Sequence, residues 1–169
     1  MILLEYHRPI HEKTFHLVVR FSDNLIGIGD VVGKHNEVVA KYGFVWFGKL
    51  GNPLSLKRID MLNEQLSKGV LTYVYLVKGN QARSTAYRAT LFSLARELAP
   101  KEQERIPRYY FENDLVQYMK SWLKIGEIEP IEMSGMGTLK ALGSINSIQE
   151  TLGRSASGYF LVHEAKNIF

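Results

Sequence analysis

The segment Asp30–Lys49, which reads DVVGKHNEVVAKYGFVWFGK, decides the fold because it joins two kinds of secondary structure at one glycine. From about Asp30 to Lys41, apolar residues recur at the spacing of one helix face. Gly43 then provides a typical helix stop, and Phe44–Phe47 follows as a short extended run. The segment therefore predicts a helix that leads directly into a strand rich in aromatic residues.

Further strands and a second helix are predicted on either side of this segment. Leu17–Phe21 reads as a buried strand, and Ser55 is a candidate N-cap for an apolar-striped helix that Gly69 closes. Val70–Lys78 is the clearest strand, with Thr85–Phe92 as its antiparallel partner. This alternation of strands and helices indicates a mixed α/β domain.

The C-terminal half adds fewer clear elements. Pro100–Pro107 reads as a charged, mobile connector, and a strand is predicted to run from Trp122 towards Pro130. Leu139–Leu152 favours one or two short helices, and Gly158–Val162 favours a closing strand. The prediction is one domain over residues 1–169, with about six strands in a small mixed barrel flanked by helices.

Composition narrows the class of protein. A chain of 169 residues with 46% hydrophobic residues is able to bury one core. The net charge of +4 and pI of about 9.2 suit a polyanionic partner without proving one. The absence of cysteine excludes disulfides and thiolate chemistry. No apolar stretch approaches the ~20 residues of a membrane helix, and no secretory signal begins the chain, so a cytoplasmic protein is expected.

Motifs for catalysis and for cofactors fail on their spacing. Gly27–His35 does not have the phosphate-loop spacing, and His35 stands where that loop needs Ser or Thr. His7, His11 and His16 are interrupted by Pro9, which argues against a metal site. No nucleophile elbow and no close carboxylate pair is present. We therefore expect a binding module with no cofactor and no metal.

An aromatic and basic set remains, formed by Trp46, Tyr109 and Tyr110 with scattered Lys and Arg residues. Aromatic rings hold an unstacked base by stacking, and cationic side chains neutralise phosphates. The alternative is that these rings fill core volume and that the cations form a solvated surface. The residues alone leave the two interpretations open.

The order of these pieces resembles a YTH domain. Phe15–Arg20, a polar turn, a helix and Gly43–Trp46 look like its first third, and Trp122–Ile125 looks like a later strand. More closely, Gly33–Lys49 is similar to the EVE-like N-terminal domain of some archaeal and bacterial McrB proteins. YTH and EVE domains belong to the PUA-like superfamily of modified-base readers.

The resemblance implies a PUA-like barrel that flips a modified base, with N6-methyladenine in double-stranded DNA favoured, into an aromatic cage. In McrB proteins such a domain is the specificity module of a modification-dependent restriction system. A separate GTPase motor follows it, and a partner subunit carries the nuclease. The chain itself is then a reader and not an enzyme.

The resemblance also assigns roles to individual residues. Trp46 matches the first cage wall, and the second wall is Tyr109 or Tyr110, whose register stays open. Contacts to the base edge fall on Ser22, Asp23 and Asn24. Charge and position alone suggest phosphate contacts for Lys49, Arg88, Arg108 and Arg154. Trp46→Ala is therefore expected to abolish the preference for the methylated base.

Three alternatives remain open from the sequence. The favoured base is 5-methylcytosine in one of them, and the ligand is methylated RNA in the second. The third is a small enzyme acting on a nucleotide or nucleic acid, with a dispersed carboxylate site at Asp23, Glu112 and Asp114.

Overall fold

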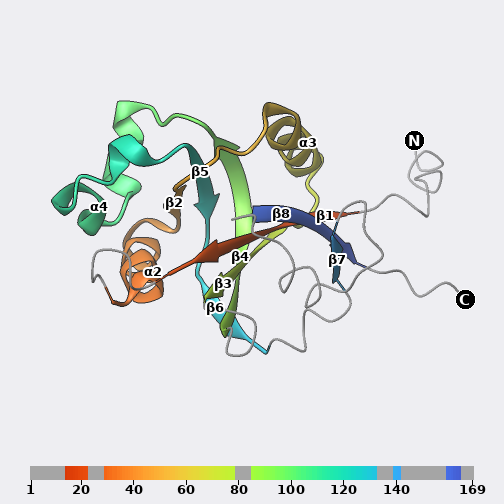
Figure 1. Ribbon diagram of the computed structural model, residues 1–169, viewed down its shortest axis with the longest axis horizontal. Coiled ribbons are helices and arrows are strands. Elements are labelled where there is room, and N and C mark those ends of the chain that lie inside the picture. Colours follow the sequence, from red (N-terminus) through yellow and green to blue (C-terminus); the bar gives the residue numbers. More distant parts are fainter. Residues whose placement is uncertain (1–13, 23–28, 79–84, 133–138, 142–158, 165–169) are drawn as a thin grey trace, which may run out of the picture.

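The computed structural model describes residues 14–22, 29–78, 85–132, 139–141 and 159–164 of the chain (Figure 1). The strands are β1 (Phe15–Phe21), β2 (Val45–Lys49), β3 (Tyr73–Lys78), β4 (Thr85–Ala95), β5 (Ser121–Ile125), β6 (Glu129–Ile131), β7 (Leu139–Ala141) and β8 (Tyr159–Glu164). The helices are α2 (Val31–Tyr42), α3 (Leu56–Ser67) and α4 (Arg108–Glu112), with 3-10 turns η2 (Pro100–Arg105) and η3 (Val116–Tyr118). The domain is therefore mixed α/β, as predicted.

All of these strands join one eight-stranded sheet in the order β2-β5-β4-β3-β1-β8-β7, with β6 paired to β4 off this path. β1 and β3 run parallel, and the other pairs are antiparallel. Within the described residues no pairing joins β2 to β7, so the sheet is not closed into the predicted barrel. It also has more strands than the six expected.

The long strand β4 connects the two halves of the sheet. Its first half pairs with β3 and β6, whereas Leu91–Ala95 pairs with β5. The register shifts between Leu91 and Ser93, and a shift of this kind bends a strand and increases its twist. In the order of the sheet, β5, β4 and β3 lie between β2 and β1.

Local capping residues mark three helix ends, and the sequence predicted two of them, at Gly43 and Ser55. The Asp30 carboxylate accepts the backbone N–H of Gly33 at 2.9 Å and caps α2. At the other end Gly43 adopts φ +87°, the left-handed conformation that favours glycine, and donates to the Val39 carbonyl at 2.7 Å. Ser55 caps α3 in the predicted way by accepting from the Arg58 N–H at 3.2 Å.

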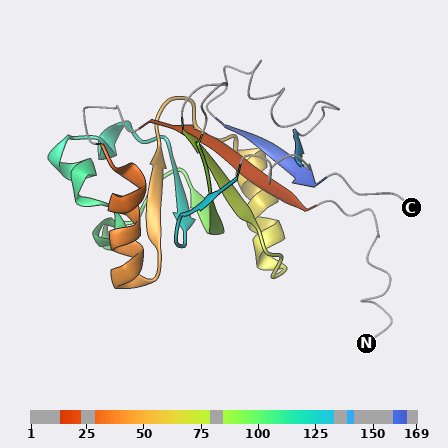
Figure 2. The ribbon, with the colours of Figure 1, turned by 90° about the horizontal axis from the view of Figure 1, so that it is seen from below.

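Alternation along β1 divides the buried residues between the two faces of the sheet. Leu17 and Val19 enter the main core, which also takes Val31 of α2 and Leu62 of α3. Val18 points to the opposite face and packs in a second cluster with strand residues of β3 and β4. α2 packs beside β2, whereas α3 packs against β4, well away from α2 (Figures 1 and 2).

Three predictions for the C-terminal half were wrong in detail. The segment predicted as a mobile connector forms η2 and is followed by Ile106, whose side chain is buried. Leu139–Ala141 forms strand β7 and not a helix, and residues 142–152 of that prediction lie outside the described residues. The strand from Trp122 ends at Ile125, and β6 follows as a separate strand.

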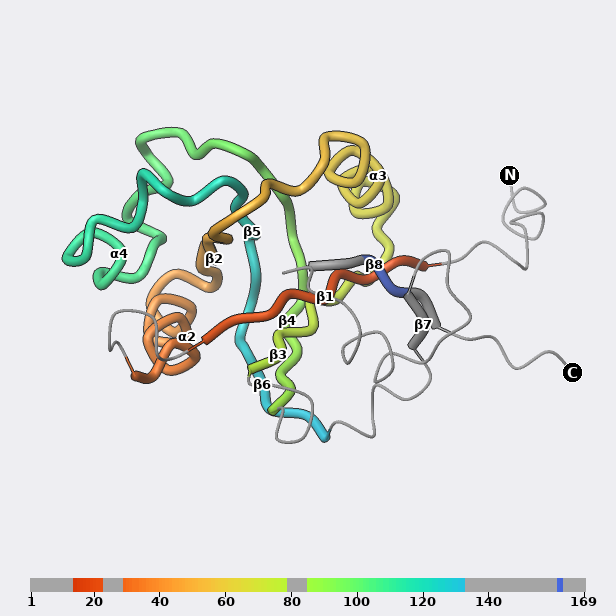
Figure 3. Tube along the Cα trace, viewed as in Figure 1, coloured from red at the N-terminus to blue at the C-terminus, as the bar shows by residue number. Residues whose placement is uncertain are grey.

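The chain between β4 and β5 makes one excursion from the sheet. It carries η2, α4 and η3, passes beside α2 at α4, and then returns to β5, as the tube in Figure 3 shows. This excursion brings α4 towards the carboxyl end of β1 and the first turn of α2. In the described part of the chain, no helix is both long enough and apolar enough to cross a membrane.

Candidate ligand pocket at the end of β1

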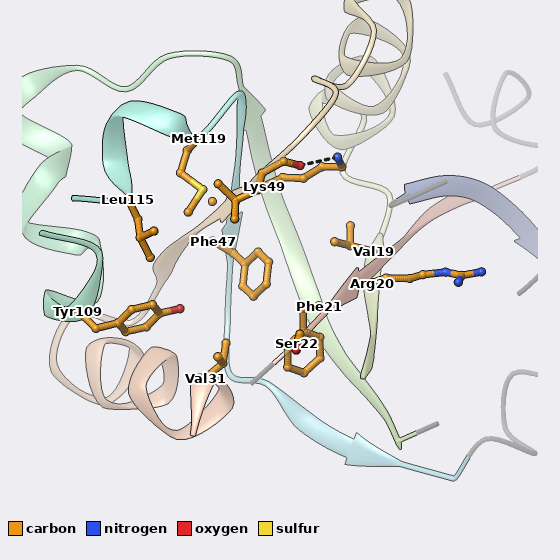
Figure 4. Close-up of a pocket in the computed structure, with 12 residues that line it drawn as sticks. Val19, Arg20, Phe21, Ser22, Val31, Phe47, Lys49, Tyr109, Leu115 and Met119 are labelled. Atoms are coloured by element: carbon orange, nitrogen blue, oxygen red, sulfur yellow. Dashed lines mark hydrogen bonds between the residues drawn. The ribbon is translucent and has the colours of Figure 1, made fainter. Parts of the chain in front are cut away.

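A cavity of about 380 Å³ lies where β1 ends, α2 begins, and β2 and the excursion meet (Figure 4). Its volume falls in the range of ~300–1,000 Å³ typical of small-molecule pockets. Most of its lining side chains are apolar. The lining residues are Val19, Arg20, Phe21, Ser22, Val31, Phe47, Gly48, Lys49, Leu50, Tyr109, Leu115 and Met119.

Aromatic rings from three elements line this pocket. Phe21 of β1 and Phe47 of β2 meet edge to face, with ring centroids 6.3 Å apart. Tyr109 comes from α4, and its hydroxyl points towards Phe47 in Figure 4. Flat rings and a thioether form a surface on which a planar heterocycle can stack.

Alternation along β2 decides which aromatic residue reaches the pocket. Val45 and Phe47 point into the main core and the pocket, so Trp46 points to the opposite face. There Trp46 is 5% exposed, and its indole N–H donates to the Glu102 carboxylate at 3.0 Å. The structure therefore places the predicted first cage wall outside this pocket, one residue away from Phe47.

Tyr110 also lies outside the pocket, behind its wall. Its ring is 2% exposed and stacks with Trp122, with centroids 5.9 Å apart. Of the two candidates for the second wall, only Tyr109 lines the cavity. Trp46 and Tyr110 belong to the same core cluster. This position agrees with the alternative in which these rings fill core volume, and contact of either ring with a base stays a prediction.

Gly48 holds the pocket wall close to the core behind it. A Cβ atom at this position would lie 2.7 Å from the Met119 Sδ and 2.8 Å from a ring carbon of Tyr110. These distances leave no room for a side chain. The Gly48 N–H donates to the Tyr110 hydroxyl at 3.0 Å, which fixes the β2 backbone between Phe47 and Lys49.

His35 of α2 supports the same wall from within the core. It is fully buried, its ring centroid lies 4.7 Å from that of Phe47, and its Nε2 lies 3.0 Å from the Tyr110 hydroxyl. Its Nδ1 lies 2.8 Å from the Val31 carbonyl. Burial lowers the pKa of His35 to about 4, and the hydrogen bond to Val31 offsets only part of that effect. The ring is therefore neutral near pH 7.

Lys49 lines the pocket, but its ammonium group points to backbone carbonyls of the following turn. Its Nζ donates to the carbonyls of Leu50 and Asn52, at 3.0 and 2.8 Å. Burial lowers the pKa of Lys49, and the two carbonyls accept two of the three N–H groups of its ammonium. Its predicted phosphate contact is untested, and the geometry shows that it holds the turn after β2.

The remaining predicted contacts are spread over the molecule. Ser22 lines the pocket, whereas Asp23, Asn24 and Arg154 lie outside the described residues. Arg88 lies over the Tyr73 ring at 4.4 Å and does not line the pocket. Arg108 is exposed and lines a separate cleft of about 610 Å³ between α2 and α4, which Tyr109 also lines.

The carboxylate set proposed for an enzyme is only partly described. Glu112 and Asp114 are exposed, and Asp23 lies outside the described residues. Among the residues that the structure describes, no three His, Asp or Glu side chains gather in a way that would hold a metal ion.

Sequence reasoning missed several pocket residues, above all Phe47, Phe21, Leu115 and Met119. The alternation of Val45 and Phe47 with Trp46 was a usable signal, because a one-residue step in a strand changes the face. Leu115 and Met119 had no local signal, since the excursion brings them to β2 only in three dimensions.

Comparison with curated proteins gives no match. A solved structure similar in part is the YTH domain of a Zygosaccharomyces rouxii protein in complex with N6-methyladenosine RNA. It is 10% identical, the comparison covers 89% of this chain and 90% of that one, and the TM-score is 0.33. A likeness at this level says nothing about what the present chain binds. The model of the Pua-like family matches residues 17–149, a stretch that includes every residue lining the pocket. This match spans most of the sequence, and the chain belongs to the Pua-like family.

Proposed function

We propose that this domain is a reader of modified nucleic acid that takes one base out of its stack into the pocket at the end of β1. The observation that carries the proposal is the apolar cavity of about 380 Å³ walled by Phe47, Phe21 and Tyr109. Membership of the Pua-like family is consistent with this role. The domain acts as a binding module and performs no catalysis of its own.

The pocket suits a base that carries an added methyl group. Stacking on aromatic side chains contributes about 1–3 kcal/mol per base, and extraction from a duplex costs a few kcal/mol. The two terms are similar in size, so a small additional apolar contact decides whether a base enters. Leu115 and Met119 supply apolar surface beside the rings on which a methyl group can be buried.

The preferred ligand in this proposal is N6-methyladenine in double-stranded DNA. This choice comes from the likeness of Gly33–Lys49 to the N-terminal domain of McrB proteins. In that setting the domain directs a restriction system whose GTPase motor and nuclease subunit are separate parts. Methylated RNA and 5-methylcytosine DNA are the competing ligands for the same pocket.

Phosphate contacts are proposed along the cleft next to the pocket. Lys34, Lys41 and Arg108 line it, and Tyr109 belongs to both cavities, so a strand whose base enters the pocket would pass this cleft. Three glutamates line it as well and balance the three cations in number, so the proposed phosphate contacts are local ones to single Lys or Arg side chains. Binding should therefore weaken with salt, as for other contacts to phosphate.

Fluorescence anisotropy tests the proposal with one DNA duplex in four versions: unmodified, N6-methyladenine, 5-methylcytosine and 5-hydroxymethylcytosine. We expect the tightest binding to the methyladenine duplex at fixed moderate salt. A preference for a cytosine mark would retain the reader and change its ligand. A matched RNA in both adenine forms decides between DNA and RNA. Equal binding to all of these oligonucleotides would refute the reader function.

A further inference from the structure

A second cavity, of about 470 Å³, lies beside the end of β4, the 3-10 turns η2 and η3, and the start of β5. Its walls differ from those of the pocket at the end of β1, because charged and amide side chains make up a large share of them: Arg96, Glu97, Gln103, Gln117 and Lys120. Among the described residues that line the two cavities, Met119 alone belongs to both. Met119 therefore separates the apolar pocket from this polar cavity.

Two backbone hydrogen bonds hold Met119 in place. Its N–H donates to the Val116 carbonyl at 3.2 Å, and the next N–H, of Lys120, donates to the Lys49 carbonyl at 3.0 Å. The second of these bonds ties the chain after η3 to the end of β2, the strand that supplies Phe47 to the pocket. The Met119 backbone is therefore fixed relative to the pocket wall.

The Met119 side chain is closely packed as well. It lies directly against β2, because a Cβ atom added to Gly48 would come within 2.7 Å of both its Cγ and its Sδ. It also belongs to the core cluster that contains Trp46, Tyr110 and Trp122, and it is only 9% exposed. A thioether chain is flexible, but a rotation here would leave a void beside Gly48 and forfeit its packing contacts. Met119 is therefore a fixed wall and not a swinging lid.

We propose that Met119 sets the upper size limit of the modification that the pocket accepts, because it closes the pocket towards the polar cavity. In the proposed binding mode a methyl group is buried against Leu115 and Met119, which Figure 4 shows on the same side of the pocket. A larger group on the same base would need the space that Met119 fills. The inference rests on the proposed function and deepens it, since it names the ligand class as bases that carry a methyl group and no larger substituent.

The size limit follows from close packing. Extra atoms forced into a filled core displace side chains and backbone, and this displacement weakens binding. Removal of the Met119 side chain beyond Cβ would instead join the pocket to the polar cavity, so that cavities of about 380 and 470 Å³ become one space. A bulky substituent would then have room without any displacement of β2.

Three adenines that differ only at N6 test the limit. Adenine, N6-methyladenine and N6-benzyladenine are each placed once in the same single-stranded oligonucleotide, so that differences in base pairing do not enter. For the wild-type protein we expect the methyl form to bind more tightly than adenine, and at least about tenfold more tightly than the benzyl form. For Met119→Ala we expect the benzyl form to bind at least as tightly as the methyl form. Fluorescence anisotropy measures each affinity.

Two neighbouring residues provide matched controls, because Leu115 lines the pocket and Val116 lines the polar cavity. Leu115→Ala removes as many heavy atoms as Met119→Ala but leaves the wall between the cavities in place. The methyl form should then still bind more tightly than the benzyl form. Val116→Ala enlarges the polar cavity without opening it to the pocket, and it should retain the wild-type affinities.

The adenine reference separates failure of this inference from failure of the proposed function. Equal affinity of the wild-type protein for the methyl and benzyl forms, both above adenine, would overturn the size limit and leave the reader function in place. Equal affinity for all three would show that the proposed function is wrong. A folded Met119→Ala protein that still rejects the benzyl form would contradict the role of Met119, as would a Leu115→Ala protein that binds the benzyl form equally well.

Thermal melting of each variant shows that it is folded before affinities are compared. If Met119→Ala does not fold, Met119→Val removes less of the side chain and takes its place in the comparison. A folded Met119→Val protein should bind the benzyl form more tightly than the wild-type protein does. An unchanged ratio of the methyl to the benzyl affinity in that variant would overturn the inference.

Discussion

Phe47, and not Trp46, is the β2 residue whose replacement should change recognition of the base. Phe47→Leu keeps an apolar side chain in the core but removes the ring face that lines the pocket. We expect the ratio of affinities for methylated and unmodified DNA to fall about tenfold, since stacking contributes ~1–3 kcal/mol per base. Anisotropy titrations with the two duplexes measure this ratio.

The matched control lies one residue away. Trp46→Phe keeps an aromatic ring in the core cluster that Trp46 shares with Tyr110 and removes the hydrogen bond to Glu102. It should lower the melting temperature and leave the affinity ratio unchanged. If Trp46→Phe lost the preference while Phe47→Leu kept it, the sequence-based assignment of the cage wall to Trp46 would be correct and the pocket described here would not be the base site.

At the scale of elements, the first turn of α2 is part of the pocket, whereas α3 is not. Asp30→Ala and Ser55→Ala each remove one N-cap hydrogen bond, to Gly33 and Arg58 respectively. Each change should destabilise the protein by about 1 kcal/mol. Only Asp30→Ala should also lower the affinity for methylated DNA, because Val31 follows it directly and lines the cavity.

Chemical denaturation and anisotropy on the same samples test this pair. Equal losses of stability with a loss of affinity in Asp30→Ala alone support the placement of α2 at the site. A similar loss of affinity in both variants would mean that general destabilisation, and not the position of the helix, controls binding. Gly33 is unsuitable for this test, because a Cβ atom there would collide with the Asp30 carboxylate.

The elements with local signals were predictable, and those made by distant contacts were not. Asp30, Gly43 and Ser55 form or end helices through neighbouring backbone groups, so the sequence shows them directly. η2 and β7 depend on partners far along the chain, and both were assigned otherwise. The pocket residues could not be predicted fully for the same reason. The sequence located β2, but which face of this strand lines the cavity depends on where α4 packs.

For the whole molecule, the burial of His35 makes stability depend on pH. Its pKa is about 4 in the folded protein and about 6.5 in an unfolded chain. Above pH 6.5 the ring is neutral in both states, and its full contribution to stability is present. As the pH falls from 6.5 towards 4, the unfolded chain takes up the proton first, so stability is lost. The loss is on the order of 3 kcal/mol and ends below about pH 4.

Comparison with His35→Gln isolates this effect from the carboxylates, which titrate in the same range. Glutamine does not titrate, so the difference in unfolding free energy between the wild-type protein and the variant should shrink as the pH is lowered from 7 to 4.5. Urea denaturation at several pH values measures that difference. Because the carboxylates contribute equally to both proteins, a difference that stays constant would mean that His35 is already able to accept a proton in the folded state.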